Sequence, residues 1–185
     1  LETGENIINE IDLITIDGIL YLTNNVGCNF VRDYGITKVY VTAHNIKEIR
    51  NNSSLTVSSI GVLRYANLTL LSEDYETEEF YTNGDFILDL EVENLNITAN
   101  GFSNFFLTGS AEKTEIALYS GNSRVEAADL LIQELIVFHR STNKIIVNPQ
   151  VSIVGEIRSL GDVISKNEPP VVNVVEYYTG RLIFD

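Results

Sequence analysis

The feature that most constrains the fold is a repeat of about 20 residues in the second half of the chain. Gly101, Gly121 and Gly161 stand at this spacing, and Ser141 completes their column. Four apolar columns run at the same period: Phe105, Val125 and Ile145; Leu107, Ala127 and Val147; Ile97, Ala117, Val137 and Ile157; and Ala111, Leu131 and Val151. Short β-rich repeats of this length are typical of a solenoid.

The repeat predicts its own packing. One short strand cannot bury its apolar face alone, but stacking the next rung at about 4.8 Å covers that face and pairs its backbone groups. Glycine is expected where each rung turns sharply with a positive φ. We therefore predict an all-β parallel solenoid with rungs of about 20 residues. The alternative is a β-sandwich, whose strands recur every 8–12 residues or so.

Strand patterns dominate the chain. Residues 11–16 and 19–22 flank Asp17-Gly18 and predict a hairpin. Only residues 124–134 also fit a helical period, although the surrounding rhythm favours a strand there. Further strands are predicted at 39–42, 67–70, 86–92, 116–118, 136–138, 145–147 and 151–154.

A solenoid needs covered ends, because an open rung would pair with another chain. We expect residues 1–6 to be disordered or an expression remnant, and residues 7–185 to form a single solenoid domain. Within it, residues 7–41 would cap one end. A final hairpin over 171–184 would cap the other end or form a contact in a homo-oligomer.

Composition excludes several functions. The chain has 12 Lys and Arg against 26 Asp and Glu, a net charge of −14, which argues against binding nucleic acid or an anionic membrane surface. It has no apolar run long enough to span a bilayer. Its lone cysteine, Cys28, excludes an internal disulfide. Methionine is absent, which suggests removal of an N-terminal export signal or a trimmed domain.

Several segments together resemble a known bacterial family. The stretch VYVTAHNIKEI at 39–49 is similar to the VYVT-x-P-x-L-K-E-I segment of the auto-transporter adhesin head GIN domain, a domain of unknown function, with His44 in place of the usual proline. Residues 118–125 and 157–163 resemble its Ser/Gly turns, and 167–174 its closing segment. The resemblance implies a right-handed parallel β-helix on an exported, often lipid-anchored, envelope protein, with no catalytic residues.

The residues themselves offer little catalytic chemistry. Neither histidine, His44 or His139, stands in a hydrolase motif, and both are expected at the surface or at a rung edge. Cys28 is expected to be a buried, inert thiol. Hydrolysis of glycosides by a solenoid would need carboxylates that recur near the rung spacing, and the regular half shows no such column. We predict no enzyme activity and no cofactor; the alternative is a polysaccharide-active hydrolase or lyase.

One acidic stretch is the candidate ligand or cation site. From Tyr65 to Glu112 there are ten acids and no Lys or Arg. The candidate residues are Glu73, Asp74, Tyr75, Glu76, Glu78, Glu79, Tyr81 and Asp85. They could hold Ca²⁺, a basic partner or sugar rings, or form a solvated insertion. If they bind Ca²⁺, millimolar Ca²⁺ should raise the melting temperature, and an unchanged value would exclude such a site.

Together these patterns predict an exported, non-enzymatic surface module. It would act at the periplasm or the cell surface, lipid-anchored through the removed N-terminus. The expected partner is a cell-surface glycan or a matrix protein, bound along a flat face of the solenoid. The sequence does not distinguish such a binding role from a purely architectural one.

Overall fold

The structure, a computed structural model, describes residues 1–5, 7–25, 37–75 and 81–185. These residues form two compact units, 1–44 and 45–185, where the sequence predicts one domain over 7–185. Each unit is described by itself, and capping of the solenoid by the first unit stays a prediction. The expectation for Cys28 concerns a residue outside the described ranges.

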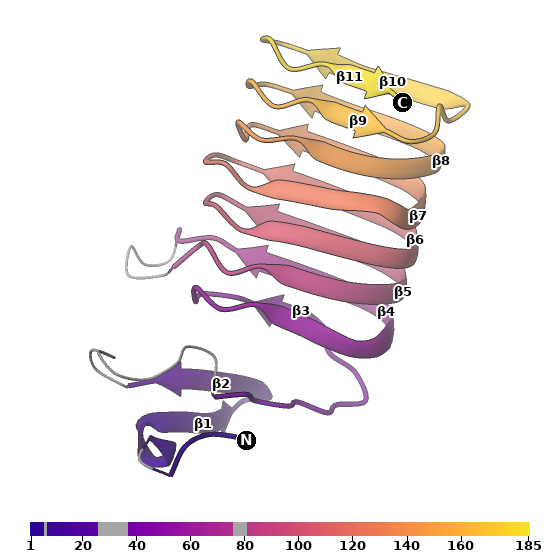
Figure 1. Cartoon of the computed structure of the whole chain (residues 1–185). Coiled ribbons are helices and arrows are strands. Elements are labelled where there is room, and N and C mark those ends of the chain that lie inside the picture. The colour runs from indigo at the N-terminus through magenta and orange to yellow at the C-terminus, as the bar shows by residue number, and fades with distance from the viewer. Residues whose placement is uncertain (6, 26–36, 76–80) are drawn as a thin grey trace. The chain divides into compact units, whose positions relative to one another are not determined.

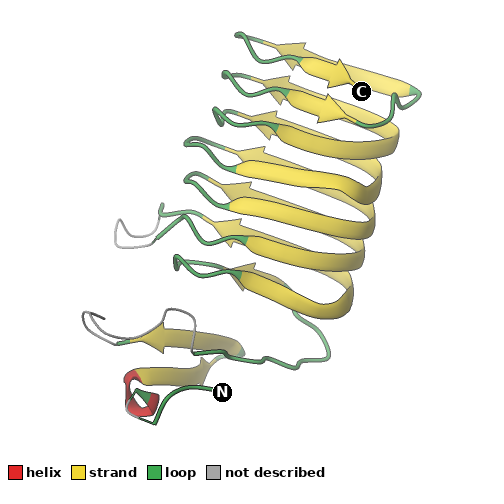
Figure 2. Cartoon of the chain, viewed as in Figure 1, coloured by secondary structure: helices red, strands yellow, loops and turns green. Residues whose placement is uncertain are grey.

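The described part of the chain is almost entirely β (Figure 2), apart from one 3₁₀ turn, η1 (Ile8–Glu10). It contains no helix with the length and apolar character needed to cross a bilayer. The strands are β1 (Ile11–Ile16), β2 (Ile19–Asn24), β3 (Glu48–Arg50), β4 (Val57–Ser72), β5 (Phe86–Ala99), β6 (Asn104–Leu118), β7 (Arg124–His139), β8 (Ile145–Ile157), β9 (Val163–Ser165), β10 (Val171–Glu176) and β11 (Leu182–Phe184).

The first unit is built on the predicted hairpin, which is confirmed. β1 and β2 pair in antiparallel fashion around Asp17 and Gly18, whose φ angles are 51° and 80°. Two consecutive positive φ values are typical of the type I′ turn that joins twisted strands. Glu2, in the stretch that the sequence places outside the fold, forms an antiparallel bridge with Lys38. The strand predicted over 39–42 is wrong, since those residues are irregular.

The second unit is a parallel β-solenoid of about seven turns, which confirms the predicted fold class. Its sheet has the strand order β11-β9-β8-β7-β6-β5-β4-β3, and β10 pairs with β8. The long strands β4–β8 each curve around one edge of the stack (Figure 1). The short strands predicted at 67–70, 86–92, 116–118 and 136–138 are therefore parts of longer strands, and those predicted at 145–147 and 151–154 merge into β8. The segment 124–134 lies within β7, so the strand interpretation is right.

Apolar columns form the core because every second side chain of a strand points inward. In β5 and β6, Phe86 and Phe105 are fully buried and stack with ring centroids 4.7 Å apart. Phe105 pairs with Val125, and Val125 with Ile145, as the 20-residue spacing predicts. This column extends through both ends of the regular region: Val57, Phe86, Phe105, Val125, Ile145, Val163 and Leu182.

Two other predicted columns are partly wrong, because the rungs differ in length. Ile97 pairs with Ile116, and Ile116 with Val137, so Ala117 and Ile157 stand outside that column. Ile132 replaces Leu131 opposite Ala111, and Leu131 is exposed. Ile116 takes the place of Ala117 because β5 and β6 pair at a constant offset of 19 residues rather than 20. Between β6 and β7, and between β7 and β8, register shifts move the later pairs to other offsets.

The glycine column lies at the turns between rungs, as expected, but positive φ explains only part of it. Gly121 has a φ of 77°, whereas Gly101 and Gly161 do not adopt positive φ. At Gly161 a Cβ would overlap the Asn143 carbonyl oxygen of the rung below. Close stacking of the turns therefore selects glycine here as much as backbone conformation does.

The C-terminal segment forms one more rung, and the predicted hairpin is wrong. β10 runs parallel to β8, with Val172 opposite Ile153, and β11 runs parallel to β9, with Leu182 opposite Val163. A hairpin would require the two strands to pair with each other in antiparallel fashion. Each strand finds its backbone partner on the preceding rung, so the rung pattern continues to the end of the described chain.

Candidate functional site

The acidic stretch does not place its described acids in one open site. Glu73 is buried, and its carboxylate meets the Arg50 guanidinium at 2.6 Å and accepts the Tyr75 amide hydrogen at 2.8 Å. Asp74 accepts a hydrogen bond of 2.6 Å from the Asn100 side chain. Asp85 accepts the backbone and side-chain N–H groups of Asn104 at 3.0 and 2.9 Å. These three carboxylates therefore stabilise turns between rungs.

The remaining candidates divide in two. Tyr75 and Tyr81 are strongly exposed, as a ligand-binding role requires. Glu76, Glu78 and Glu79 lie outside the described residues. Among the residues that the structure does describe, no group of three or more His, Cys, Asp or Glu side chains could hold a metal ion. Ligand or cation binding by the acidic stretch stays a prediction.

Tyr75 is one end of a row of aromatic contacts that sequence reasoning missed. Its ring meets Tyr119 edge to face at 6.1 Å between centroids, and Tyr119 meets Phe138 at 5.3 Å. The Arg158 guanidinium then lies 5.9 Å from the Phe138 ring centroid and 4.2 Å from the Tyr177 ring centroid. We call this continuous set the aromatic row: Tyr75, Tyr119, Phe138, Arg158 and Tyr177.

The rung repeat creates the aromatic row. Tyr119, Arg158 and Tyr177 each follow a strand, and their backbone N–H groups bond to Ala99, His139 and Ile157 of the preceding rungs. Each of them is the first residue after the end of its strand, so the three occupy equivalent positions on different turns of the solenoid. Edge-to-face rings and cation–π contacts stabilise such a row. A search of the sequence for outward aromatics at rung spacing could have found Tyr119 and Tyr177.

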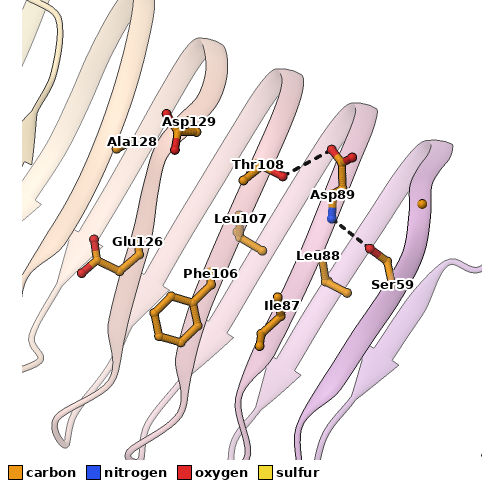
Figure 3. A pocket seen from close by; sticks show the side chains of 11 residues that line it. Ser59, Ile87, Leu88, Asp89, Phe106, Leu107, Thr108, Glu126, Ala128 and Asp129 are labelled. Atoms are coloured by element: carbon orange, nitrogen blue, oxygen red, sulfur yellow. Dashed lines mark hydrogen bonds between the residues drawn. The ribbon is translucent and has the colours of Figure 1, made fainter.

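A second surface is an open groove of about 400 Å³ on strands β4–β7 (Figure 3). We call it the bulge groove. Its lining combines carboxylates, hydroxyls and exposed apolar side chains: Ser59, Gly61, Ile87, Leu88, Asp89, Phe106, Leu107, Thr108, Glu126, Ala128 and Asp129. Sequence reasoning missed this groove, because its residues come from four rungs at irregular spacing.

Register shifts explain why the groove exists. Between β4 and β5, three residues of β4 (59–61) stand opposite one residue of β5. Between β6 and β7, three residues of β7 (127–129) stand opposite two of β6. β5 and β6 stay in register with each other at this level. The extra residues bow outward because the packed core has no room for them, so β5 and β6 form a floor between two raised strands.

Hydrogen bonds order one side of the groove. The Thr108 hydroxyl donates to Asp89 Oδ1 at 3.3 Å, and the Asp89 amide donates to Ser59 Oγ at 3.0 Å (Figure 3). On the other side, Glu126 forms an ion pair with Arg124 of the same strand. The groove thus holds three carboxylates: Asp89, which is positioned by a hydrogen bond; Glu126, whose charge is balanced by Arg124; and Asp129, which is exposed.

The carboxylate geometry bears on hydrolysis. Asp89 lies on β5 and Asp129 on β7, two rungs apart. At about 4.8 Å per rung, two rungs separate them by about 10 Å along the stack. Glycosidases place their carboxyl pair about 5–5.5 Å or 6.5–9.5 Å apart. The rung spacing is therefore too large for a retaining pair and at the limit for an inverting one.

The prediction for His139 is wrong. It places this histidine at the surface or at a rung edge, whereas the side chain is fully buried. It lies in an apolar column between Leu118 and Ile157, and neither ring nitrogen has a hydrogen-bond partner among the described residues. Burial lowers the pKa of His139 to about 4; the Asn143 backbone and the Asp162 carboxylate offset this only in part. His44 is exposed, as expected.

Comparison with known proteins agrees with the fold. A crystal structure of a putative adhesin from Bacteroides fragilis superposes with a TM-score of 0.83, covering 98% of this chain and 79% of that one at 20% identity. No curated protein shows significant sequence similarity to this chain. The family model described as putative auto-transporter adhesin, head GIN domain, matches residues 1–169. The chain, whose turns and closing segment resemble that family, therefore belongs to the auto-transporter adhesin head GIN domain family.

Proposed function

We propose that this chain is a non-enzymatic, exported binding module that holds a cell-surface glycan along the aromatic row. Membership of an adhesin family supports an adhesin-like role at the surface. The glycan ligand is our inference from the side chains of the row. A matrix protein is the other partner that an adhesin could hold, and the experiment below distinguishes the two.

The aromatic row is the observation that carries the proposal. Tyr75 and Tyr177, at its two ends, expose more than half of their surface, and Tyr119 exposes 38%. Aromatic rings present a flat apolar face with a polar hydroxyl, which suits the C–H face and the hydroxyls of a sugar. The rungs repeat about every 4.8 Å, a length comparable with one unit of an extended glycan. Consecutive sugars could therefore meet consecutive rungs.

The test is a glycan array, followed by titration of the best binder. Tyr119→Ala and Tyr177→Ala should each weaken binding by about two- to tenfold, because each removes one stacking platform worth about 0.5–1.5 kcal/mol. Both rings are surface groups, so the melting temperature should change little. Isothermal titration calorimetry gives the affinity, and circular dichroism gives the melting temperature.

The matched control is Tyr178→Ala. Tyr178 follows Tyr177 directly and is exposed to a similar extent, yet among the described residues its ring takes part in none of the ring or cation–π contacts of the aromatic row. The Tyr178→Ala variant should therefore bind glycan with the affinity of the unchanged protein. Silence on the glycan array together with binding to a matrix protein would contradict the proposal, as would equal losses in Tyr177→Ala and Tyr178→Ala.

The bulge groove favours a second candidate, a polysaccharide-active enzyme, because it places acids beside the exposed ring of Phe106. The two-rung separation of Asp89 and Asp129 and the pairing of Glu126 with Arg124 argue against it. We therefore expect a glycan bound by the protein to keep its chain length during prolonged incubation. Release of new reducing ends that Asp89→Asn abolishes would establish the enzyme instead.

A further inference from the structure

The bulge groove is an open depression whose lining combines apolar, hydroxyl and carboxylate groups. Its volume of about 400 Å³ lies within the 300–1,000 Å³ or so that is usual for ligand pockets. Ile87 and Phe106 are register partners on β5 and β6, so they lie side by side, and they expose 51% and 40% of their surface. Together they form an exposed apolar floor.

The charge of the groove favours a cation. The described residues that line it include three carboxylates, Asp89, Glu126 and Asp129, and neither Lys nor Arg. Arg124 compensates Glu126 from outside the lining, which leaves Asp89 and Asp129 on opposite sides of the floor. A cationic group between them would lie beside Thr108, which pairs with Asp89 and stands next to the β7 residues that include Asp129 (Figure 3).

The hydroxyls of the groove add hydrogen-bonding capacity that a simple cation would not use. Thr108 donates to Asp89 Oδ1, so the Thr108 oxygen can still accept a hydrogen bond. Ser59 accepts the Asp89 amide hydrogen and keeps its own hydroxyl hydrogen to donate. The Thr108 contact holds Asp89 Oδ1, so the carboxylate is already oriented for a ligand, while the Ser59 contact fixes the Asp89 backbone.

We propose that the bulge groove binds a hexosamine unit with a free amino group. The C–H face of the sugar lies on Phe106 and Ile87, its ammonium group lies between Asp89 and Asp129, and its hydroxyls meet Ser59 and Thr108. A lysine side chain would use the apolar floor and the carboxylates but leave both hydroxyls without a role, so the amino sugar fits better. This site is separate from the aromatic row and does not depend on glycan binding there.

The probe is the disaccharide of β-1,4-linked glucosamine, compared with its fully N-acetylated form, titrated at pH 6 and low salt. The charged disaccharide should bind, and the acetylated form should bind at least tenfold more weakly, because acetylation removes the positive charge. The double variant Asp89→Asn/Asp129→Asn should lose at least tenfold in affinity, and Phe106→Ala should also weaken binding.

Glu112→Gln/Glu115→Gln is the matched control, because it removes two exposed acids of β6 outside the groove and changes the net charge equally. It should bind as the unchanged protein does, as should Tyr119→Ala in the aromatic row. Equal loss in both double variants would mean that only net charge matters, which overturns the proposal. Equal binding of the two disaccharides, or equally tight binding of acetyl-lysine amide, would also overturn it.

Discussion

Phe105→Ala should lower the free energy of unfolding by about 3–5 kcal/mol, the usual cost of truncating a buried phenylalanine. Phe105 is fully buried near the middle of an apolar column and stacks on Phe86 with an interplanar angle of 7°. Its loss leaves a cavity that regular rungs, tied by backbone hydrogen bonds on both sides, cannot close. Urea denaturation followed by circular dichroism measures the effect.

The neighbouring residue supplies the control. Phe106 follows Phe105 in β6 but points outward and exposes 40% of its surface. Phe106→Ala should therefore cost no more than about 1 kcal/mol, although it removes the same number of atoms. If both variants unfold at the same urea concentration, the inward column does not determine the stability of the solenoid.

Acid should destabilise the protein through His139. Well above pH 6.5 the imidazole is neutral in the folded and the unfolded chain, so it contributes no pH dependence there. Between pH 6.5 and about 4 the unfolded chain binds a proton that the folded chain, with its lowered pKa, does not bind. The free energy of unfolding should fall by about 3 kcal/mol across this window, and more slowly below it.

His139→Leu should flatten this dependence. The column around position 139 holds Ala99, Leu118 and Ile157, so leucine suits the site and leaves no nitrogen without a partner. His44→Gln, at an exposed position, should keep the acid sensitivity. The measurement is urea denaturation at a series of pH values from 7 to 4. An identical pH profile for His139→Leu and the unchanged protein would contradict the assignment.

The sequence predicts the fold well where each rung keeps its length. Phe105, Val125 and Ile145 form the predicted column because the first part of these rungs contains no extra residue. Between β5 and β6 the partners are 19 residues apart rather than 20, so Ile116 replaces Ala117 beside Ile97. Beyond the register shift between β6 and β7 the fixed period fails as well, and Ile132 replaces Leu131 beside Ala111. A bulge adds residues without changing the hydrophobic pattern much, so its position is hard to read from a single sequence.

The candidate sites, too, can be predicted only in part from the sequence. An acidic run is visible in the sequence, but whether Glu73 is a ligand or a turn residue depends on Arg50, which comes from the preceding rung. The aromatic row joins residues from the ends of several strands, and the bulge groove joins four strands whose registers differ. Contacts between residues far apart in the chain decide both surfaces.

By itself, the sequence determined the all-β solenoid, the inward column of Phe105, Val125 and Ile145, the first hairpin and the family. Each of these follows from local periodicity, in which every second side chain enters the core and one rung covers the next. Only the tertiary structure decided that the last segment is a rung, that His139 is buried, and where rings and carboxylates gather on the surface. These features depend on register between rungs, and a shift of one residue turns a side chain from the core to the surface.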